Sequence, residues 1–289
     1  MRLGVVMTGA GAHAAACVGV LQELSRREIE PYAVCGVLGG AWPAALYAAG
    51  WEACAMEGAV GQAGRFGGRM LLPGLSCRKF LQGRTPAVST GRRLDRLLDA
   101  QAGQRLLSLC PRPAAFLCRT ARIGHRVIFS TRAYHQEDGA MLSMQATLGF
   151  SARAAMGLPP FLPPMEWMGS TLLPETDLCF AVRQVRALGA QRALVIIPQI
   201  APRSRMDALD LAAMSCCSWH KDAVGEGAVV LRVPMPEGVQ ALDAAKAPAC
   251  MEAGRRAAEA ELDRIFERMG MAFCRVLPFR MQLGATRRP

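Results

Sequence analysis

A tight turn between an apolar segment and an alanine-rich segment constrains the fold of this chain more than any other feature. Residues 31–41 read PYAVCGVLGGA, so a short apolar run gives way to closely spaced glycines and then to helix-forming residues. Short apolar runs favour buried strands, glycine permits a sharp change of direction, and alanine favours a helix. The sequence therefore predicts a strand that ends at Cys35, a turn over 36–40 that includes Gly39 and Gly40 and has Leu38 at its centre, and a helix that begins at Ala41.

Strand and helix patterns alternate along the rest of the chain. An apolar run at 3–7, helical spacing at 14–26 and a second strand at 29–35 predict a βαβ unit at the start of the fold. Further helices are expected over 41–49, 51–60, 92–107, 141–156, 175–188 and 251–269, and further strands over 114–119, 126–131, 193–198 and 229–233. This alternation predicts an α/β layered fold, not an all-α or all-β one.

The size and composition of the chain are those of a globular protein. It has 289 residues, of which 52% are hydrophobic and 20% charged, which is enough to bury a large core and excludes disorder. We expect one α/β domain over 1–200, with an irregular Gly/Pro/Arg-rich excursion or lid at 61–91. Residues 201–289 are expected to add a strand and helices that pack on the same domain.

The charged and sulfur-containing residues limit the expected partners. The 34 basic and 23 acidic residues give a formal net charge of +11, but the basic residues are scattered, so we expect no specific nucleic-acid site. The basic surface is instead compatible with peripheral contact with an anionic membrane. The 11 cysteines show no C-x-x-C spacing, which favours reduced thiols and predicts no metal site and no cofactor. Since no apolar run reaches the length of a membrane span, we expect a cytoplasmic protein, membrane-peripheral at most.

Leu38 occupies a position that holds a nucleophile in many hydrolases. A strand, a G-x-S-x-G turn and a helix form the nucleophile elbow, in which the turn presents the central side chain to a site. Gly36 and Gly40 supply the two outer glycines, but the central residue is a leucine. A hydrocarbon side chain can neither attack a carbonyl group nor be activated by a base.

The glycine-rich loop before the first helix has two interpretations. Residues 9–14, GAGAHA, match the G-x-G-x-x-A fingerprint of dinucleotide-binding folds. That fingerprint also needs an acidic residue at the end of the second strand, where this chain has Cys35 and Gly36. A nucleotide-binding regulator therefore remains as one alternative, and the other interpretation joins this loop to the elbow.

Together, the loop and the elbow resemble the patatin-like phospholipases. That family has a G-G-G-x-R-G loop after its first strand, a G-V-L stretch in the following helix and G-x-S-x-G after its second strand. This chain has GAGAHA at 9–14, GVL at 19–21 and GVLGG at 36–40, in the same order and at similar spacing. The resemblance covers roughly residues 2–200 and implies a three-layer sandwich with a mostly parallel central sheet and helices on both faces.

The same resemblance assigns roles to individual positions. The residues that correspond to the oxyanion loop are Gly9, Ala10, Gly11, Ala12 and His13, with His13 in place of the family's Arg or Lys. A helix and the proline-rich run at 158–164 precede the family's D-G-G or D-G-A motif, which falls here on 167–170 and puts Met168 in the place of the catalytic aspartate. Neither member of the Ser-Asp dyad is then present, and Leu38→Ser with Met168→Asp is expected to restore some ester hydrolysis if these assignments are right.

Three functional hypotheses follow. The first is an inactive homologue of lipid acyl hydrolases that binds a lipid, an acyl chain or a protein partner that the sequence does not identify, through a cleft that Leu38 and Trp42 either line or fill. The second is an active lipid esterase with a non-standard nucleophile or base, for which Cys35, Ser170 and Glu166 are the candidates. The third is the nucleotide-binding regulator that uses the loop at 9–14.

Overall fold

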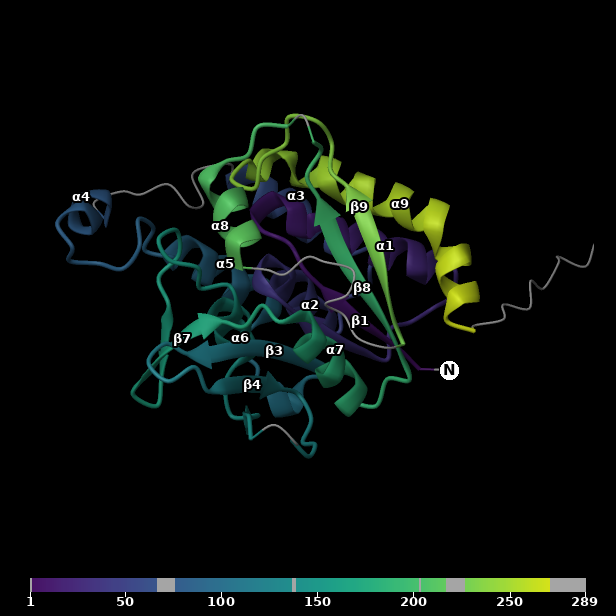
Figure 1. Ribbon diagram of the computed structural model, residues 1–289, viewed down its shortest axis with the longest axis horizontal. Helices are drawn as coiled ribbons and strands as arrows, with labels where there is room; N and C mark the ends of the chain where they lie inside the picture. The colour runs from purple at the N-terminus through teal and green to yellow at the C-terminus, as the bar shows by residue number, and fades with distance from the viewer. Residues whose placement is uncertain (1, 67–75, 137–138, 203, 217–226, 271–289) are drawn as a thin grey trace, which may run out of the picture.

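A computed structural model describes residues 2–66, 76–136, 139–202, 204–216 and 227–270 (Figure 1). The strands in this part of the chain are β1 (Leu3–Met7), β2 (Ala33–Gly36), β3 (Ala114–Thr120), β4 (Arg126–Ser130), β5 (Met141–Ser143), β6 (Met165–Trp167), β7 (Ser170–Pro174), β8 (Arg192–Gln199) and β9 (Ala228–Pro234). The helices are α1 (Ala15–Arg26), α2 (Ala41–Ala48), α3 (Met56–Phe66), α4 (Ser76–Leu81), α5 (Arg92–Ala102), α6 (Leu148–Ala155), α7 (Leu178–Ala187), α8 (Ala208–Cys216) and α9 (Ala247–Arg268). None of these helices is both long and apolar enough to cross a lipid bilayer.

The strands form one mixed sheet whose centre is parallel. Its order is β5-β4-β3-β2-β1-β8-β9, and β7 pairs with both β3 and β6. β1, β2, β3, β8 and β9 run parallel to one another, whereas β4 and β7 run antiparallel to β3. The predicted βαβ unit is therefore confirmed, with β1 and β2 parallel.

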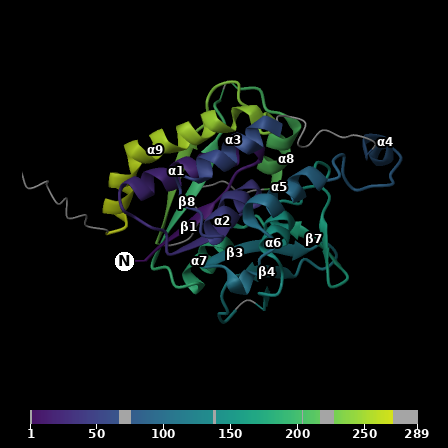
Figure 2. The same cartoon turned by 180° about the vertical axis from the view of Figure 1, so that it is seen from behind.

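Helices cover both faces of the sheet, as Figures 1 and 2 show from opposite sides. One hydrophobic core lies between the sheet and α1, α2, α5, α6 and α9, and a second lies on the opposite face beneath α7. Successive residues of β1 alternate between the two cores, with Val5 in the first and Val6 in the second. The fold is therefore the predicted three-layer α/β sandwich.

The part of residues 201–289 that the structure describes belongs to the same sandwich. β9 pairs with β8 along its whole length, and α9 packs lengthwise on α1 (Figure 2). α9 buries a stripe of side chains at helical spacing, which includes Cys250, Leu262 and Ile265. Residues 271–289 lie outside the described part of the chain.

Several predicted segments differ from the structure. The helices expected over 51–60, 92–107 and 175–188 begin or end at other residues, as α3, α5 and α7. The helix expected over 141–156 is wrong at its start, because Met141–Ser143 form β5 beside β4 and α6 begins only at Leu148. The Thr147 side chain accepts a hydrogen bond from the N–H of Phe150 and so caps α6 at that point. The excursion at 61–91 is also more regular than expected, since it contains the end of α3 and all of α4, while its residues 67–75 lie outside the described part.

Candidate functional site

Leu38 lies at the corner of the turn between β2 and α2, as the elbow pattern predicts. β2 ends at Gly36, and a single 3-10 turn over Leu38–Gly40 leads into α2. The backbone of Leu38 has φ +51°, in the left-handed region that leucine rarely adopts. Such a conformation costs on the order of 1–3 kcal/mol and persists only where the surrounding fold enforces it. The turn therefore holds Leu38 in a strained backbone conformation although its side chain is apolar.

The glycines of the turn are required by close packing. A Cβ atom on Gly36 would lie 2.4 Å from the Cα atom of Ala41, and one on Gly40 would lie 2.1 Å from the carbonyl oxygen of Met7. Neither neighbour can move without displacing the backbone of α2 or β1. These two positions explain why the G-x-x-x-G spacing is such a strong sequence signal.

The glycine-rich loop packs directly against the elbow. The N–H of Gly39 donates a hydrogen bond of 2.8 Å to the carbonyl oxygen of Gly9. Gly9 and Gly11 have φ values of +132° and +48°, so both use backbone conformations that favour glycine. The two motifs are thus brought together, as the resemblance implies.

Several backbone donors at this junction are already engaged. An oxyanion hole needs N–H groups directed at the place where charge develops, typically from the residue after the nucleophile and from the glycine-rich loop. Here the N–H of Gly39 is bound to Gly9, and the N–H of Ala12 donates 2.8 Å to the carbonyl oxygen of Ala241. A Cβ on Gly11 would lie 1.9 Å from that same oxygen. The segment around Ala241 therefore covers the loop at the place where a substrate oxyanion would be expected.

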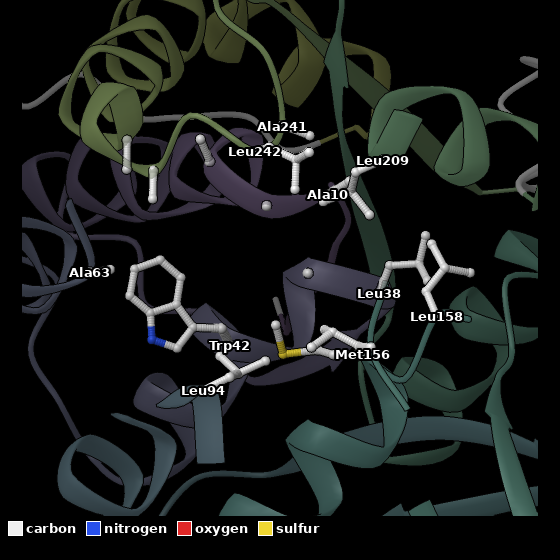
Figure 3. A pocket seen from close by; sticks show the side chains of 16 residues that line it. Ala10, Leu38, Trp42, Ala63, Leu94, Met156, Leu158, Leu209, Ala241 and Leu242 are labelled. Carbon is white, nitrogen blue, oxygen red and sulfur yellow. The ribbon is translucent and has the colours of Figure 1, made fainter. Parts of the chain in front are cut away.

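An apolar cavity lies above the elbow (Figure 3). It has a volume of about 80 Å³ and is lined by 16 residues from the glycine-rich loop, the elbow, α2, α3, α5, α8 and the segments at 156–162 and 241–247. None of the lining side chains is titratable, and the only side-chain nitrogen is that of Trp42. The indole N–H of Trp42 donates 2.8 Å to Oε1 of Gln101, which holds the ring at the cavity wall. Leu38 and Trp42 therefore line a remaining cavity and do not fill it completely.

Met168 does not line this cavity. It occupies the turn of the β6–β7 hairpin, between the paired residues Trp167 and Ser170, and 81% of its surface is exposed. Its backbone has φ +48°, which fits a hairpin turn. The structure therefore does not bring Met168 to Leu38, and the assignment of Met168 to the acid position gains no support from geometry.

The register of the sheet places a different residue opposite the elbow. β3 pairs with β2 along its first residues and with β7 along its last, while β4 occupies its other edge. β7 therefore lies on the same edge of β3 as β2 does, and it runs toward the end of β2 from the opposite direction. Glu175 directly follows β7, and its N–H donates to the carbonyl oxygen of Leu117, just beyond the residues of β3 that pair with β2. The Glu175 carboxylate accepts the N–H groups of Thr176 and Asp177 and lies 3.3 Å from Nε of Arg126. This acid, which sequence reasoning missed, is held by its own neighbours and does not line the cavity.

His13 anchors the loop to a second buried acid. Its Nδ1 atom lies 3.3 Å from Oδ1 of Asp210, and its Nε2 atom lies 3.4 Å from the carbonyl oxygen of Val239. The contact between His13 and Asp210 is short enough for an ion pair, but its geometry does not meet the criteria for a hydrogen bond. Burial raises the pKa of the Asp210 carboxyl, and the hydrogen bond from the N–H of Asp207 offsets this only in part. The D-x-x-D spacing of Asp207 and Asp210 at the start of α8 is a capping pattern that would have revealed this helix in the sequence.

The alternative nucleophiles and bases are poorly placed for chemistry. Cys35 is fully buried in the second core, and burial raises the pKa of its thiol, which disfavours the reactive thiolate. Ser170 and Glu166 lie on the exposed β6–β7 hairpin, where the Glu166 carboxylate accepts a hydrogen bond from Thr171. None of these three side chains lines the cavity above the elbow. Within the described residues, no group of three or more His, Cys, Asp and Glu side chains is arranged to hold a metal ion.

Comparison with known proteins identifies the fold. No protein-family model matches the chain, and no curated protein matches it by sequence. Among solved structures, VipD from Legionella pneumophila superposes with a TM-score of 0.50 at 11% identity, over 91% of this chain and 67% of VipD. The fold is patatin-like. The type III effector ExoU, in its complex with SpcU from Pseudomonas aeruginosa, gives a TM-score of 0.40 at 14% identity, and this chain spans about half of it, 52%.

Proposed function

We propose that this patatin-like protein is a catalytically inactive homologue of lipid acyl hydrolases that holds an apolar group, such as part of an acyl chain, beside Leu38. The observation that carries the proposal is the wholly apolar lining of the cavity where the elbow presents its central side chain. Burial of apolar surface contributes about 25 cal/mol per Å², so such a lining favours hydrocarbon over water. Charge on a ligand would find no compensating group there.

The size of the cavity limits what it holds without rearrangement. Its volume of about 80 Å³ is smaller than the roughly 150 Å³ apolar cavity that accommodates benzene in another protein. A short stretch of hydrocarbon therefore fits, whereas a whole long acyl chain requires the surrounding segments to move. We propose that the end of an acyl chain enters this cavity while the rest lies outside it.

The absence of turnover is tested with small esters and a covalent probe. We expect no hydrolysis of p-nitrophenyl acyl esters and no labelling by a fluorophosphonate above the level of heat-denatured protein. The physical reason is that Leu38 offers no nucleophile and the N–H groups of Gly39 and Ala12 are engaged within the protein. Labelling that persists in Leu38→Ala and disappears in Cys35→Ala or Ser170→Ala would instead support an esterase with a non-standard nucleophile.

Binding is tested through the fluorescence of Trp42, which lines the cavity. A fatty acid brominated near its methyl end should quench the wild-type protein, and Trp42→Phe should remove the saturable part of the quenching. Ala63→Leu fills the cavity from α3 and should abolish binding, whereas Ala260→Leu adds the same atoms on the exposed side of α9 and should leave it unchanged. Saturable quenching that survives both Trp42→Phe and Ala63→Leu would place the ligand elsewhere and reject the proposal.

A nucleotide-binding role has little geometric support. A phosphate at the glycine-rich loop would have to approach its N–H groups, and Ala241 already accepts from Ala12 and lies close to Gly11. In its ionised form, the buried Asp210 carboxyl beside His13 would also repel an anion. Calorimetric titration with NAD, NADP and ATP is expected to give no binding heat.

A further inference from the structure

The segment from α4 to α5 is strongly basic. Residues 76–96 contain six basic side chains and one acidic side chain. The basic residues are Arg78, Lys79, Arg84, Arg92, Arg93 and Arg96, and all six are exposed. The acidic residue, Asp95, is half-buried and paired with the buried Arg153 through a contact of 2.8 Å from Oδ1 to Nε. Its charge is thus already balanced from inside the protein, so the net charge that the segment presents to solvent is positive.

This segment also carries an exposed apolar side chain. α4 projects away from the body of the molecule in both Figure 1 and Figure 2. Leu81, at the end of α4, is 80% exposed, nearly as much as any large hydrophobic residue of the described chain. A projecting helix that combines basic side chains with an exposed leucine has the two features that favour adsorption to a lipid surface.

α5 connects this basic surface to the apolar cavity. Its inner face buries Leu94, Leu97 and Leu98, and Leu94 lines the cavity above the elbow. Its outer face exposes Arg92 and Arg96. A lipid surface that contacts the outer face of α5 would therefore be separated from the cavity by the thickness of one helix.

We propose that residues 76–96 dock this protein on the surface of an anionic lipid bilayer, with the basic side chains against the headgroups and Leu81 inserted among them. The proposal deepens the proposed function, on which it rests for the choice of a lipid partner. Nucleic acid also attracts basic residues, but it offers no apolar layer for an exposed leucine on a projecting helix. An anionic membrane complements both the charge and Leu81.

The test is co-sedimentation of the full chain with vesicles. Wild-type protein should bind vesicles of phosphatidylcholine mixed with phosphatidylserine, more weakly as salt increases, and should not bind vesicles of phosphatidylcholine alone. Neutralising Arg78, Lys79 and Arg84 to glutamine should weaken binding about fivefold per residue, or about a hundredfold together. Leu81→Ser should weaken it about tenfold and should leave the salt dependence unchanged.

A matched variant controls for net charge. Arg122→Gln, Arg264→Gln and Arg268→Gln remove the same charge from exposed positions outside the segment and should leave vesicle binding within about twofold of wild type. Three outcomes would overturn the proposal. The two triple variants could lose vesicle binding equally, or wild type could bind neutral and anionic vesicles equally well. Wild type could also bind a DNA duplex more tightly than anionic vesicles. Trp42 quenching by dissolved fatty acid should be unchanged in the segment variant, so a failure of docking is distinguishable from a failure of the cavity to bind.

Discussion

At the scale of single residues, Leu38 combines a strained backbone with an apolar side chain that is 3% exposed. Restoring a hydroxyl there does not restore a site, because the N–H of Gly39 is bound to Gly9 and no acid lines the cavity. We therefore expect Leu38→Ser to show no ester hydrolysis. Adding Met168→Asp, which the motif alignment favours, should change nothing, because that carboxylate would stand in solvent at a hairpin turn.

Fluorophosphonate labelling and hydrolysis of p-nitrophenyl butyrate measure this outcome, with circular dichroism as the control for folding. The double variant Leu38→Ser with Met168→Asp is compared with Leu38→Ala with Met168→Asp. Fluorophosphonate labelling of the first that is absent in the second would show that the hairpin reaches the elbow in solution. Such a result would restore the Met168 assignment and refute the placement described above.

A second prediction for a single residue concerns Asp210, a buried carboxyl whose pKa is raised by burial. A pKa that is higher in the folded than in the unfolded state means that the folded protein binds the proton more tightly. The resulting stability is fully present below the unfolded pKa of about 3.9 and is lost as the pH rises through the folded value. The free energy of unfolding of wild type relative to Asp210→Asn should therefore fall with rising pH, by at most about 1.4 kcal/mol per pH unit.

Urea unfolding of both proteins at a series of pH values, starting near the unfolded pKa of about 3.9 and rising from there, measures this difference. Asp207→Asn is the matched control, because it removes a nearby carboxylate that caps α8 from a less buried position. A relative stability that rises with pH would mean that the charged carboxylate is the favoured form and that the attraction of His13 outweighs the effect of burial.

At the scale of elements, the contact between α1 and α9 depends on two glycines. A Cβ on Gly19 would lie 1.9 Å from the carbonyl oxygen of Met251, and one on Gly254 would lie 2.0 Å from that of Ala16. Because both obstacles are backbone atoms, Gly254→Ala must push the helices apart and should lower the free energy of unfolding by about 1–3 kcal/mol or more. Gly61→Ala, in α3 with open space around the added methyl, should instead raise it by about 0.5–1 kcal/mol. Chemical denaturation of both variants measures the two values, and similar small effects at both sites would contradict the close packing.

The elements also show which features the sequence could predict. The elbow and the βαβ unit follow from local spacing, because Gly36 and Gly40 meet backbone that is near in sequence or in the adjacent strand. The cover over the glycine-rich loop could not be predicted, since Ala12 and Ala241 are far apart in the chain and neither carries a distinctive side chain. The start of α6 was predictable in principle from the cap at Thr147, but the apolar residues before it fit strand β5 equally well.

At the scale of the whole molecule, helices cover both faces of the sheet, and the described cysteines lie both in the sheet and outside it. Those at positions 17, 35, 110, 118 and 250 are buried and free, in α1, β2, the segment before β3, β3 and α9. Burial raises the pKa of Cys17 and of Cys250 to about 12. Cys54 and Cys216 are exposed and free. A thiol in the first group can react only when the fold opens around it, because both access and thiolate formation are suppressed.

Iodoacetamide labelling read by mass spectrometry should therefore modify Cys54 and Cys216 before the five buried thiols of the described chain. The five buried thiols should become labelled together, at a rate that rises with urea in the same proportion for each, because opening of the common core exposes all of them. The decisive residue is Cys35, which follows Val34 in β2 and lies three residues before Leu38. If Cys35 were labelled as fast as Cys54 in the folded protein, the elbow would open independently of the sheet, its thiol would be accessible to substrates, and the inactive assignment would fail in favour of a cysteine-dependent esterase.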